Sequence, residues 1–205
     1  MTRIDAVVFD IGNVLIEWQP ERFFDRRIGS ERRRALFAQV PLEAMNHAID
    51  LGAPLVETVA GCAAKHPGWS AEINLWARAW LDISGPAIPG AADTLLALRA
   101  RGVTTLALSN FGNEPFALAL GRYPFLDAFD RRFLSGALGC AKPDPAIYAT
   151  LERETGIDPQ RLLFTDDRPE NIAAAQARGW QTHLFRDPDG WAERLHAEGL
   201  LKRDA

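Results

Sequence analysis

The chain has 205 residues, of which 47% are hydrophobic and 24% are charged, and its formal net charge at pH 7 is −4. This composition is that of an ordinary soluble globular protein, and the acidic balance argues against a nucleic-acid-binding surface. We find no apolar run long enough to cross a bilayer and no signal peptide, so we expect a cytoplasmic protein. Cys62 and Cys140 lack the spacing of a disulfide framework or a metal site. The basic run at residues 32–34 is typical of a solvated helix face.

The first apolar segment, residues 6–9, predicts a strand buried on both faces, as in a parallel sheet. Asp10 follows directly, and Gly12 and Asn13 continue the chain as a turn. In open α/β sheets, ligands bind outside the carboxyl ends of the strands, so Asp10 would face a ligand crevice. Considered alone, this aspartate is equally consistent with an ordinary turn.

The stretch from Glu17 to Ala87 shows only helical patterns, and no strand is expected in it. Proline and glycine residues mark the helix boundaries. We expect Trp69, Trp76 and Trp80 in the core of this stretch, with Trp18 near a pocket. The expected helices cover residues 20–28, 30–40, 41–51, 54–65 and 70–81.

From residue 88 onward, helices and strands alternate, which predicts a Rossmann-like, doubly wound parallel α/β sheet. The helical stretch interrupts this alternation after the first strand and is expected to form an inserted α-helical cap over the crevice. The expected domains are therefore a core of residues 1–16 and 88–205 and a cap of residues 17–87. The expected strands of the core after the first are 103–108, 132–134, 162–165 and 181–185, and residues 136–145 are expected to form a loop.

Polar side chains follow three of the expected strands, at the edge where parallel strands present their carboxyl ends. Carboxylates without cysteine or histidine suit Mg²⁺, whereas hydroxyl, amide and ammonium donors suit a phosphate. Each segment alone also fits a turn, an exposed lysine or a helix N-cap, and only their combination favours a site. An aspartate here could attack phosphorus as a covalent nucleophile. The residues concerned are Asp10, Ser109, Asn110, Asp166 and Asp167, together with Lys142 from a loop.

The segments FDIGNVL, LSN, AKPDPAIY and FTDDRPENI, in this order, resemble motifs I to IV of the haloacid dehalogenase superfamily. The resemblance extends over about residues 4–186, and FDIGNVL resembles a subgroup of small, helically capped bacterial phosphatases that includes enzymes acting on sugar 1-phosphates. It implies Asp10 as the nucleophile; Asp10, the Gly12 backbone oxygen and Asp167 as Mg²⁺ ligands, supported by Asp166; and Ser109 and Lys142 as phosphoryl ligands, with Asn110 beside them.

One position departs from the pattern that this resemblance implies. Most phosphatases of the superfamily carry a second aspartate two residues after the nucleophile, as general acid and base, and here Gly12 stands there. Such assistance is worth about 10²–10⁴-fold in rate. Three explanations stay open: a good leaving group, a substitute from the cap or a metal-bound water, and weak catalysis. In the cap, Asn46, His47 and Asp50 are candidate substrate contacts, and His47 is a candidate substitute acid.

The expected function is a Mg²⁺-dependent phosphomonoester hydrolase that acts on a small phosphorylated metabolite, such as a sugar phosphate, through an aspartyl-phosphate on Asp10. The alternatives are a 2-haloacid dehalogenase, a sugar phosphomutase and a non-catalytic protein that binds phosphorylated metabolites. We expect no nucleic-acid or membrane partner and either a monomer or a homodimer. The sequence does not identify the substrate.

Overall fold

Strand β1 (Ala6–Phe9) forms the centre of a five-stranded parallel sheet in the computed structural model, which describes residues 3–202. The strand order is β5-β4-β1-β6-β7, and all four side chains of β1 are fully buried. A short apolar run such as AVVF is stable at this place because helices cover both faces of a parallel sheet. The predicted fold class is therefore confirmed. The other strands of the sheet are β4 (Thr104–Ser109), β5 (Arg131–Leu134), β6 (Leu162–Asp166) and β7 (Gln181–Leu184).

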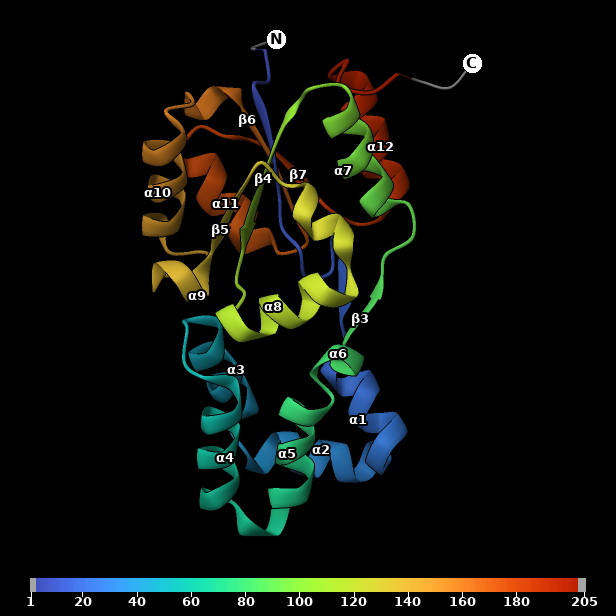
Figure 1. Ribbon diagram of the computed structural model, residues 1–205, viewed down its shortest axis with the longest axis vertical. Coiled ribbons are helices and arrows are strands. Elements are labelled where there is room, and N and C mark those ends of the chain that lie inside the picture. The colour runs from blue at the N-terminus through green and yellow to red at the C-terminus, as the bar shows by residue number, and fades with distance from the viewer. Residues whose placement is uncertain (1–2, 203–205) are drawn as a thin grey trace.

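The two faces of the sheet are covered by different helices (Figure 1). Val7 and Phe9 point to the face covered by α7 and α12, where Phe9 packs edge-on against Trp191. Val8 points to the opposite face, which α10 and α11 cover and where Tyr148 is fully buried. The alternation follows the period of two in a strand. The helices of this part are α7 (Ala91–Ala100), α8 (Asn113–Arg122), α9 (Ser135–Leu138), α10 (Pro145–Thr155), α11 (Pro169–Ala177) and α12 (Pro188–Ala197), with 3₁₀ helices at Pro124–Ala128 and Pro159–Arg161.

A helical segment, residues 20–83, lies beyond the carboxyl ends of the parallel strands, so that it faces the edge where Asp10 is located (Figure 1). Its interior is apolar and continuous with one side of the sheet core, and Phe24 stacks on Trp76 within it. The helices are α1 (Pro20–Ile28), α2 (Ser30–Gln39), α3 (Leu42–Asp50), α4 (Leu55–Lys65), α5 (Ser70–Arg78) and α6 (Trp80–Ile83), with a 3₁₀ helix at Pro67–Trp69.

Two short strands connect the helical segment to the rest of the chain, and the expectation of no strand between Glu17 and Ala87 is wrong. Strand β2 (Ile16–Trp18) pairs antiparallel with β3 (Ser84–Ala87). Local sequence does not indicate these strands, because β2 has three residues and β3 contains Gly85-Pro86, which usually interrupts a strand. They form because distant parts of the chain meet. The loop expected at residues 136–145 is also wrong in its first part, because residues 136–138 belong to the short helix α9.

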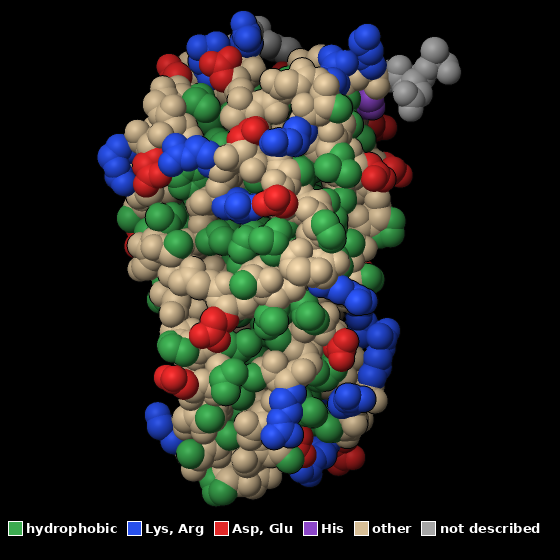
Figure 2. Space-filling view, viewed as in Figure 1, with side chains coloured by type: hydrophobic (Ala, Val, Ile, Leu, Met, Phe, Trp, Pro, Cys, Tyr) green, Lys and Arg blue, Asp and Glu red, His purple; other side chains and the backbone are tan. Residues whose placement is uncertain are grey.

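Several charged side chains on the surface are paired with opposite charges. Of the basic run at 32–34, Arg32 bonds to Glu72 and Arg33 to Asp25, whose facing atoms are 2.7 and 2.9 Å apart. Basic side chains gather over α1 at the edge of the helical segment, where Arg26 and Arg27 are exposed (Figure 2). Among residues 3–202, no helix combines the length and the apolar character needed to span a membrane.

Candidate active site

Asp10 lies where β1 ends, and its side chain is only 7% exposed. The backbone N–H of Asp10 donates to the Thr165 carbonyl at 2.9 Å, which extends the pairing of β1 with β6 by one residue. The carboxylate atom Oδ1 accepts bonds from the Ile11 amide at 2.7 Å, Ser109 Oγ at 2.7 Å and Lys142 Nζ at 2.9 Å. All the bonds that described residues donate to this carboxylate end on Oδ1. The second oxygen, Oδ2, is therefore left for a ligand or a reaction.

Lys142 is almost completely buried and joins two carboxylates. Its Nζ lies 2.9 Å from Asp10 Oδ1 and 2.6 Å from Asp166 Oδ2. Two bonds hold its backbone to Asn110: the Lys142 amide donates to Asn110 Oδ1 at 2.7 Å, and Asn110 Nδ2 donates to the Lys142 carbonyl at 2.9 Å. Asn110 thus fixes the loop that carries the lysine, and the lysine in turn fixes the two carboxylates.

Asp166 and Asp167 end strand β6 and differ in their surroundings. Asp166 is fully buried, and Asn171 Nδ2 lies 3.0 Å from each of its oxygens. Asp167 is partly exposed and accepts a bond from Asn13 Nδ2 at 3.3 Å. One oxygen each of Asp10, Asp166 and Asp167 lies within 4.8 Å of the others. A set of hard oxygen donors this close together fits a divalent cation such as Mg²⁺.

The site carries more negative than positive charge. Burial raises the pKa of Asp10 to about 7; Asp166 adds to the rise, and Lys142 opposes it. Burial alone would lower the pKa of Lys142, but the two carboxylates hold it above its ordinary value. Burial and the charge of Asp166 also raise the pKa of Asp167. One lysine therefore compensates three carboxylates only in part, and a bound cation would supply the missing positive charge.

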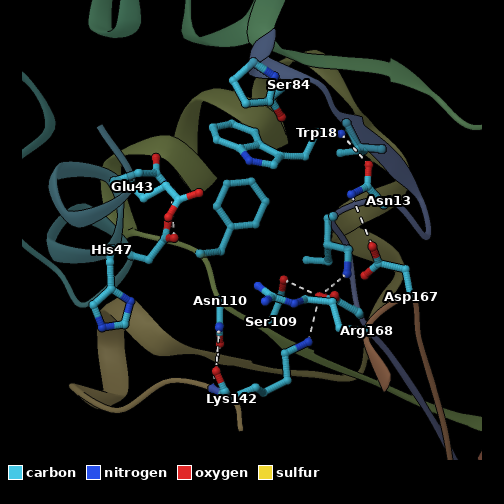
Figure 3. Close-up of a pocket in the computed structure, with 18 of the residues that line it drawn as sticks. Asn13, Trp18, Glu43, His47, Ser84, Ser109, Asn110, Lys142, Asp167 and Arg168 are labelled. Atoms are coloured by element: carbon cyan, nitrogen blue, oxygen red, sulfur yellow. Dashed lines mark hydrogen bonds and ion pairs between the residues drawn. The ribbon is translucent and has the colours of Figure 1, made fainter. Parts of the chain in front are cut away.

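A cavity of about 480 Å³ lies between the sheet edge and the helical segment. Glu43 and His47 of α3 line it on the side opposite Asn13 and Asp167, and Trp18 lies next to Asn13 (Figure 3). The aromatic rings of Trp18, Trp76, Trp80 and Phe111 form an apolar wall. Of the predicted site residues, those that line this cavity are Asp10, Gly12, Asn46, His47, Asp50, Ser109, Asn110, Lys142 and Asp167. Asp166 does not line the cavity. It is buried and holds the ammonium group of Lys142, which does line it.

The sequence did not indicate Asn13 as a site residue, and for Asn171 it favoured an ordinary helix start over a role in holding the loop of Asp166 and Asp167. Asn13 supports Asp167 and accepts the Trp18 amide at 2.9 Å, while Asn171 holds Asp166. Asn13 has a positive φ of 53°. Asn adopts this conformation more readily than most residues, so an asparagine after Gly12 indicates a turn. It does not indicate the contact with Asp167, which lies 154 positions further along the chain. Asn171 follows Pro169 in a helix start, where its type is common. Trp76 and Trp80 are both buried core residues, as expected, and cavity residues.

Comparison with known proteins agrees with this architecture. A model of the haloacid dehalogenase-like hydrolase family matches residues 4–179. The enolase-phosphatase E1 of Acidiphilium cryptum is 30% identical over 152 residues, covering 70% of this chain and 65% of that protein. The (S)-2-haloacid dehalogenase 1 of a Pseudomonas species is 33% identical over 96 residues, covering 47% of this chain and 42% of that protein. The matches thus span less than two thirds of the length of either relative.

A solved structure shares the whole fold. A HAD family enzyme of Bacteroides thetaiotaomicron, crystallised with magnesium and inorganic phosphate, superimposes with a TM-score of 0.75 at 24% identity, covering 93% of this chain and 98% of that one. The parallel sheet, the carboxylate cluster at its edge and the inserted helices define an α/β protein of the hydrolase type. The chain belongs to the haloacid dehalogenase-like hydrolases, which confirms the family that the four sequence motifs indicate.

Proposed function

We propose that this protein is a Mg²⁺-dependent phosphomonoester hydrolase that acts on a small phosphorylated metabolite. The observation that carries the proposal is the single carboxylate of Asp10, which is contacted by Ser109 and Lys142 and lies beside the Asp166-Asp167 pair. A buried ammonium and a hydroxyl are donors for phosphoryl oxygens, and clustered carboxylates are ligands for Mg²⁺. Relatives that are named phosphatases, such as the enolase-phosphatase, support the same reaction class.

In the proposed reaction, Asp10 attacks the phosphorus atom and forms an aspartyl-phosphate while the ester oxygen leaves. Ser109 and Lys142 hold the phosphoryl oxygens, and Asn110 keeps Lys142 in place through its backbone. Asp10, the Gly12 backbone oxygen and Asp167 would hold Mg²⁺, with Asp166 supporting them. The cation supplies positive charge that lets a carboxylate approach a phosphate dianion. Water then hydrolyses the aspartyl-phosphate and regenerates Asp10.

The helical segment is proposed to act as the cap that selects the substrate. Its helix α3 brings Asn46, His47 and Asp50 to the cavity, and its residues Trp76 and Trp80 form part of the aromatic wall. A cavity of about 480 Å³ with one polar and one aromatic side suits a metabolite of sugar size. The enclosure favours small esters over phosphoproteins.

The test is phosphate release from a panel of small phosphate esters by the wild type and by Asp10→Asn, each with Mg²⁺ and with EDTA. We expect release that requires Mg²⁺ and that falls at least about 10³-fold in Asp10→Asn, because the nucleophile is lost. Asp189→Asn removes an exposed carboxylate from α12 and should behave like the wild type. Binding of phosphate esters without turnover in the wild type would instead indicate a non-catalytic binding protein.

The dehalogenase relative favours a second candidate reaction, the release of halide from a 2-haloacid by the same Asp10. Two further carboxylates within 4.8 Å of the nucleophile would repel an anionic haloacid unless a cation were bound. We therefore expect no chloride from 2-chloropropionate in EDTA. Chloride release under these conditions would favour dehalogenation over phosphate hydrolysis.

A further inference from the structure

Asp50 combines three properties that a proton donor of this cavity requires, and Gly12 leaves that role open. It lines the cavity, it comes from the helical segment that faces the sheet edge, and it is partly buried. The other acidic groups that line the cavity from this segment are less protected: Glu43 is exposed, and Glu21 is exposed and paired with Arg33. His47 is exposed as well.

Two side chains orient the Asp50 carboxylate. Asn46 Nδ2 donates to Asp50 Oδ2 at 2.8 Å, and Trp76 Nε1 in turn donates to Asn46 Oδ1 at 3.2 Å. Asn46 is therefore held in one orientation, with its NH₂ group toward Asp50. This bond ends on Oδ2, so in the protonated acid Oδ2 is the oxygen that accepts from Asn46 and the proton is carried by Oδ1.

The backbone of Asp50 is anchored to the parallel-sheet part of the protein. Ser135 Oγ donates a hydrogen bond to the Asp50 carbonyl. Ser135 Oγ also accepts a hydrogen bond from the Phe111 amide at 2.8 Å. Close packing at Gly112 completes the contact, since a Cβ there would lie 2.4 Å from the Ile49 carbonyl oxygen. Asp50 is thus fixed relative to the loop that follows Ser109, although its helix belongs to a different segment.

The electrostatic surroundings favour the protonated acid. Burial raises the pKa of Asp50 to about 7, the negative charge of Asp10 adds to the rise, and the Gly112 amide opposes it. A cation at Asp10 would offset the second of these causes and leave the first, which is the largest. The charged groups that share the cavity with Asp50 are Asp10, Glu21, Glu43, Lys142, Asp167 and Arg168.

We propose that Asp50 is the general acid and base of this enzyme, in place of the aspartate that Gly12 replaces. This inference rests on the proposed phosphatase function. When Asp10 attacks phosphorus, the P–O ester bond breaks and its electron pair goes to the leaving oxygen, which takes the proton of Asp50 and departs as an alcohol. The Asp50 carboxylate then takes a proton from the water that attacks the aspartyl-phosphate. Inorganic phosphate leaves, and Asp10 returns as a carboxylate.

The test compares three esters that differ in how much their leaving oxygen needs a proton: p-nitrophenyl phosphate, phenyl phosphate and glycerol 1-phosphate. In Asp50→Asn we expect kcat to fall by about 10²–10⁴-fold for phenyl and glycerol phosphates, and by less than about tenfold for p-nitrophenyl phosphate. Asp50→Glu keeps the acid and should recover part of the loss. Thermal unfolding shows whether each variant is folded.

His47→Asn is the matched control, because it removes the rival acid from the same helix and cavity; we expect its effect on kcat to be similar for all three esters. Equal losses for the three esters in folded Asp50→Asn, or a raised KM with unchanged kcat, would overturn the assignment and make Asp50 a substrate contact. Wild-type protein that releases phosphate from none of them would overturn the proposed function itself. The two failures are therefore distinguishable.

Discussion

The charge balance of the site depends on one side chain, Lys142. Its ammonium contacts Asp10 and Asp166, and all three groups are buried. Breaking a buried ion pair by removing one partner costs more than the pair itself contributes, since the charge that remains has lost both water and its partner. The lysine therefore has a structural role that is separate from any contact it makes with a phosphate.

Replacing the lysine should expose this structural role. In EDTA, Lys142→Met is expected to lower the free energy of unfolding by about 3–5 kcal/mol, because two buried carboxylates lose their counter-charge. Mg²⁺ should restore part of the loss by taking over that charge. Urea unfolding with and without Mg²⁺ measures both effects. Lys65→Met, at an exposed position of α4, should change stability by no more than about 0.5 kcal/mol. If Lys142→Met also lowered the free energy of unfolding by no more than about 0.5 kcal/mol, the structural role of Lys142 would be contradicted.

At the scale of elements, helix α3 is held against the sheet edge by close backbone contacts. Its C-terminal end contacts the loop after β4 and the short helix α9 after β5 through glycines, where backbones approach without side chains between them. A Cβ at Gly52 would lie 2.6 Å from the Gly136 carbonyl oxygen, and φ at Gly52 is +103°, a conformation that favours glycine. Glu114 adds a bond to the Leu55 amide at 3.1 Å. The position of α3 thus depends on residues outside the helical segment.

A single methyl group should disturb this contact. Gly112→Ala places a Cβ against the Ile49 carbonyl, so α3 must move, and we expect the free energy of unfolding to fall by about 1–3 kcal/mol. Gly121→Ala is the control: it lies in α8, no atom apart from its chain neighbours and its own helix backbone would lie within 4 Å of its Cβ, and alanine should stabilise the helix by about 0.5–1 kcal/mol. Denaturant titration of the two variants gives the comparison. If Gly112→Ala and Gly121→Ala had the same free energy of unfolding, α3 would move without any loss of stability.

At the scale of the whole molecule, cation binding and folding are linked. The three carboxylates come from β1 and from the end of β6, which are far apart in sequence and meet only in the folded chain. A ligand that binds only the folded state stabilises it by mass action. The repulsion among Asp10, Asp166 and Asp167 is a cost of folding that such a ligand would offset.

Mg²⁺ should accordingly raise the stability of the protein. At a free concentration 100 times its dissociation constant, we expect about 2.7 kcal/mol of added free energy of unfolding. Asp167→Asn should remove most of this gain, whereas Asp189→Asn, at an exposed position of α12 outside the cluster, should keep it. Unfolding at several Mg²⁺ concentrations measures the gain. If wild type and Asp167→Asn respond alike, the proposed metal ligand is wrong.

The sequence was informative about a strand where one segment carries the signal, and about the site only where several segments were combined. The run AVVF followed by Asp10 predicted both the central strand and the side chain at its end, because a buried parallel strand is apolar on both faces. The β2–β3 pair was missed because its stability comes from pairing between distant segments. The contact of Asn13 was missed for the same reason, and for Asn171 the sequence favoured a helix start over its contact with Asp166, because the partners of both are set by the fold. Asp50 was a candidate substrate contact from the sequence, but its bond to Asn46 and its partial burial follow only from the fold, since helical spacing alone leaves the inward face undetermined.

The helical segment leaves and rejoins the rest of the chain at a single place. Gln19 donates to the Ile83 carbonyl at 3.2 Å, and Ile16 pairs with Ala87, so about 65 intervening residues begin and end side by side. A piece with adjoining ends can be exchanged for another in evolution, or by an engineer, while Asp10, Lys142 and the Asp166-Asp167 pair stay in their strands and loops. With Asp50 as the acid, the exchanged segment carries the proton donor as well as the substrate contacts. A new segment would therefore have to supply its own proton donor for the enzyme to remain active on a new substrate.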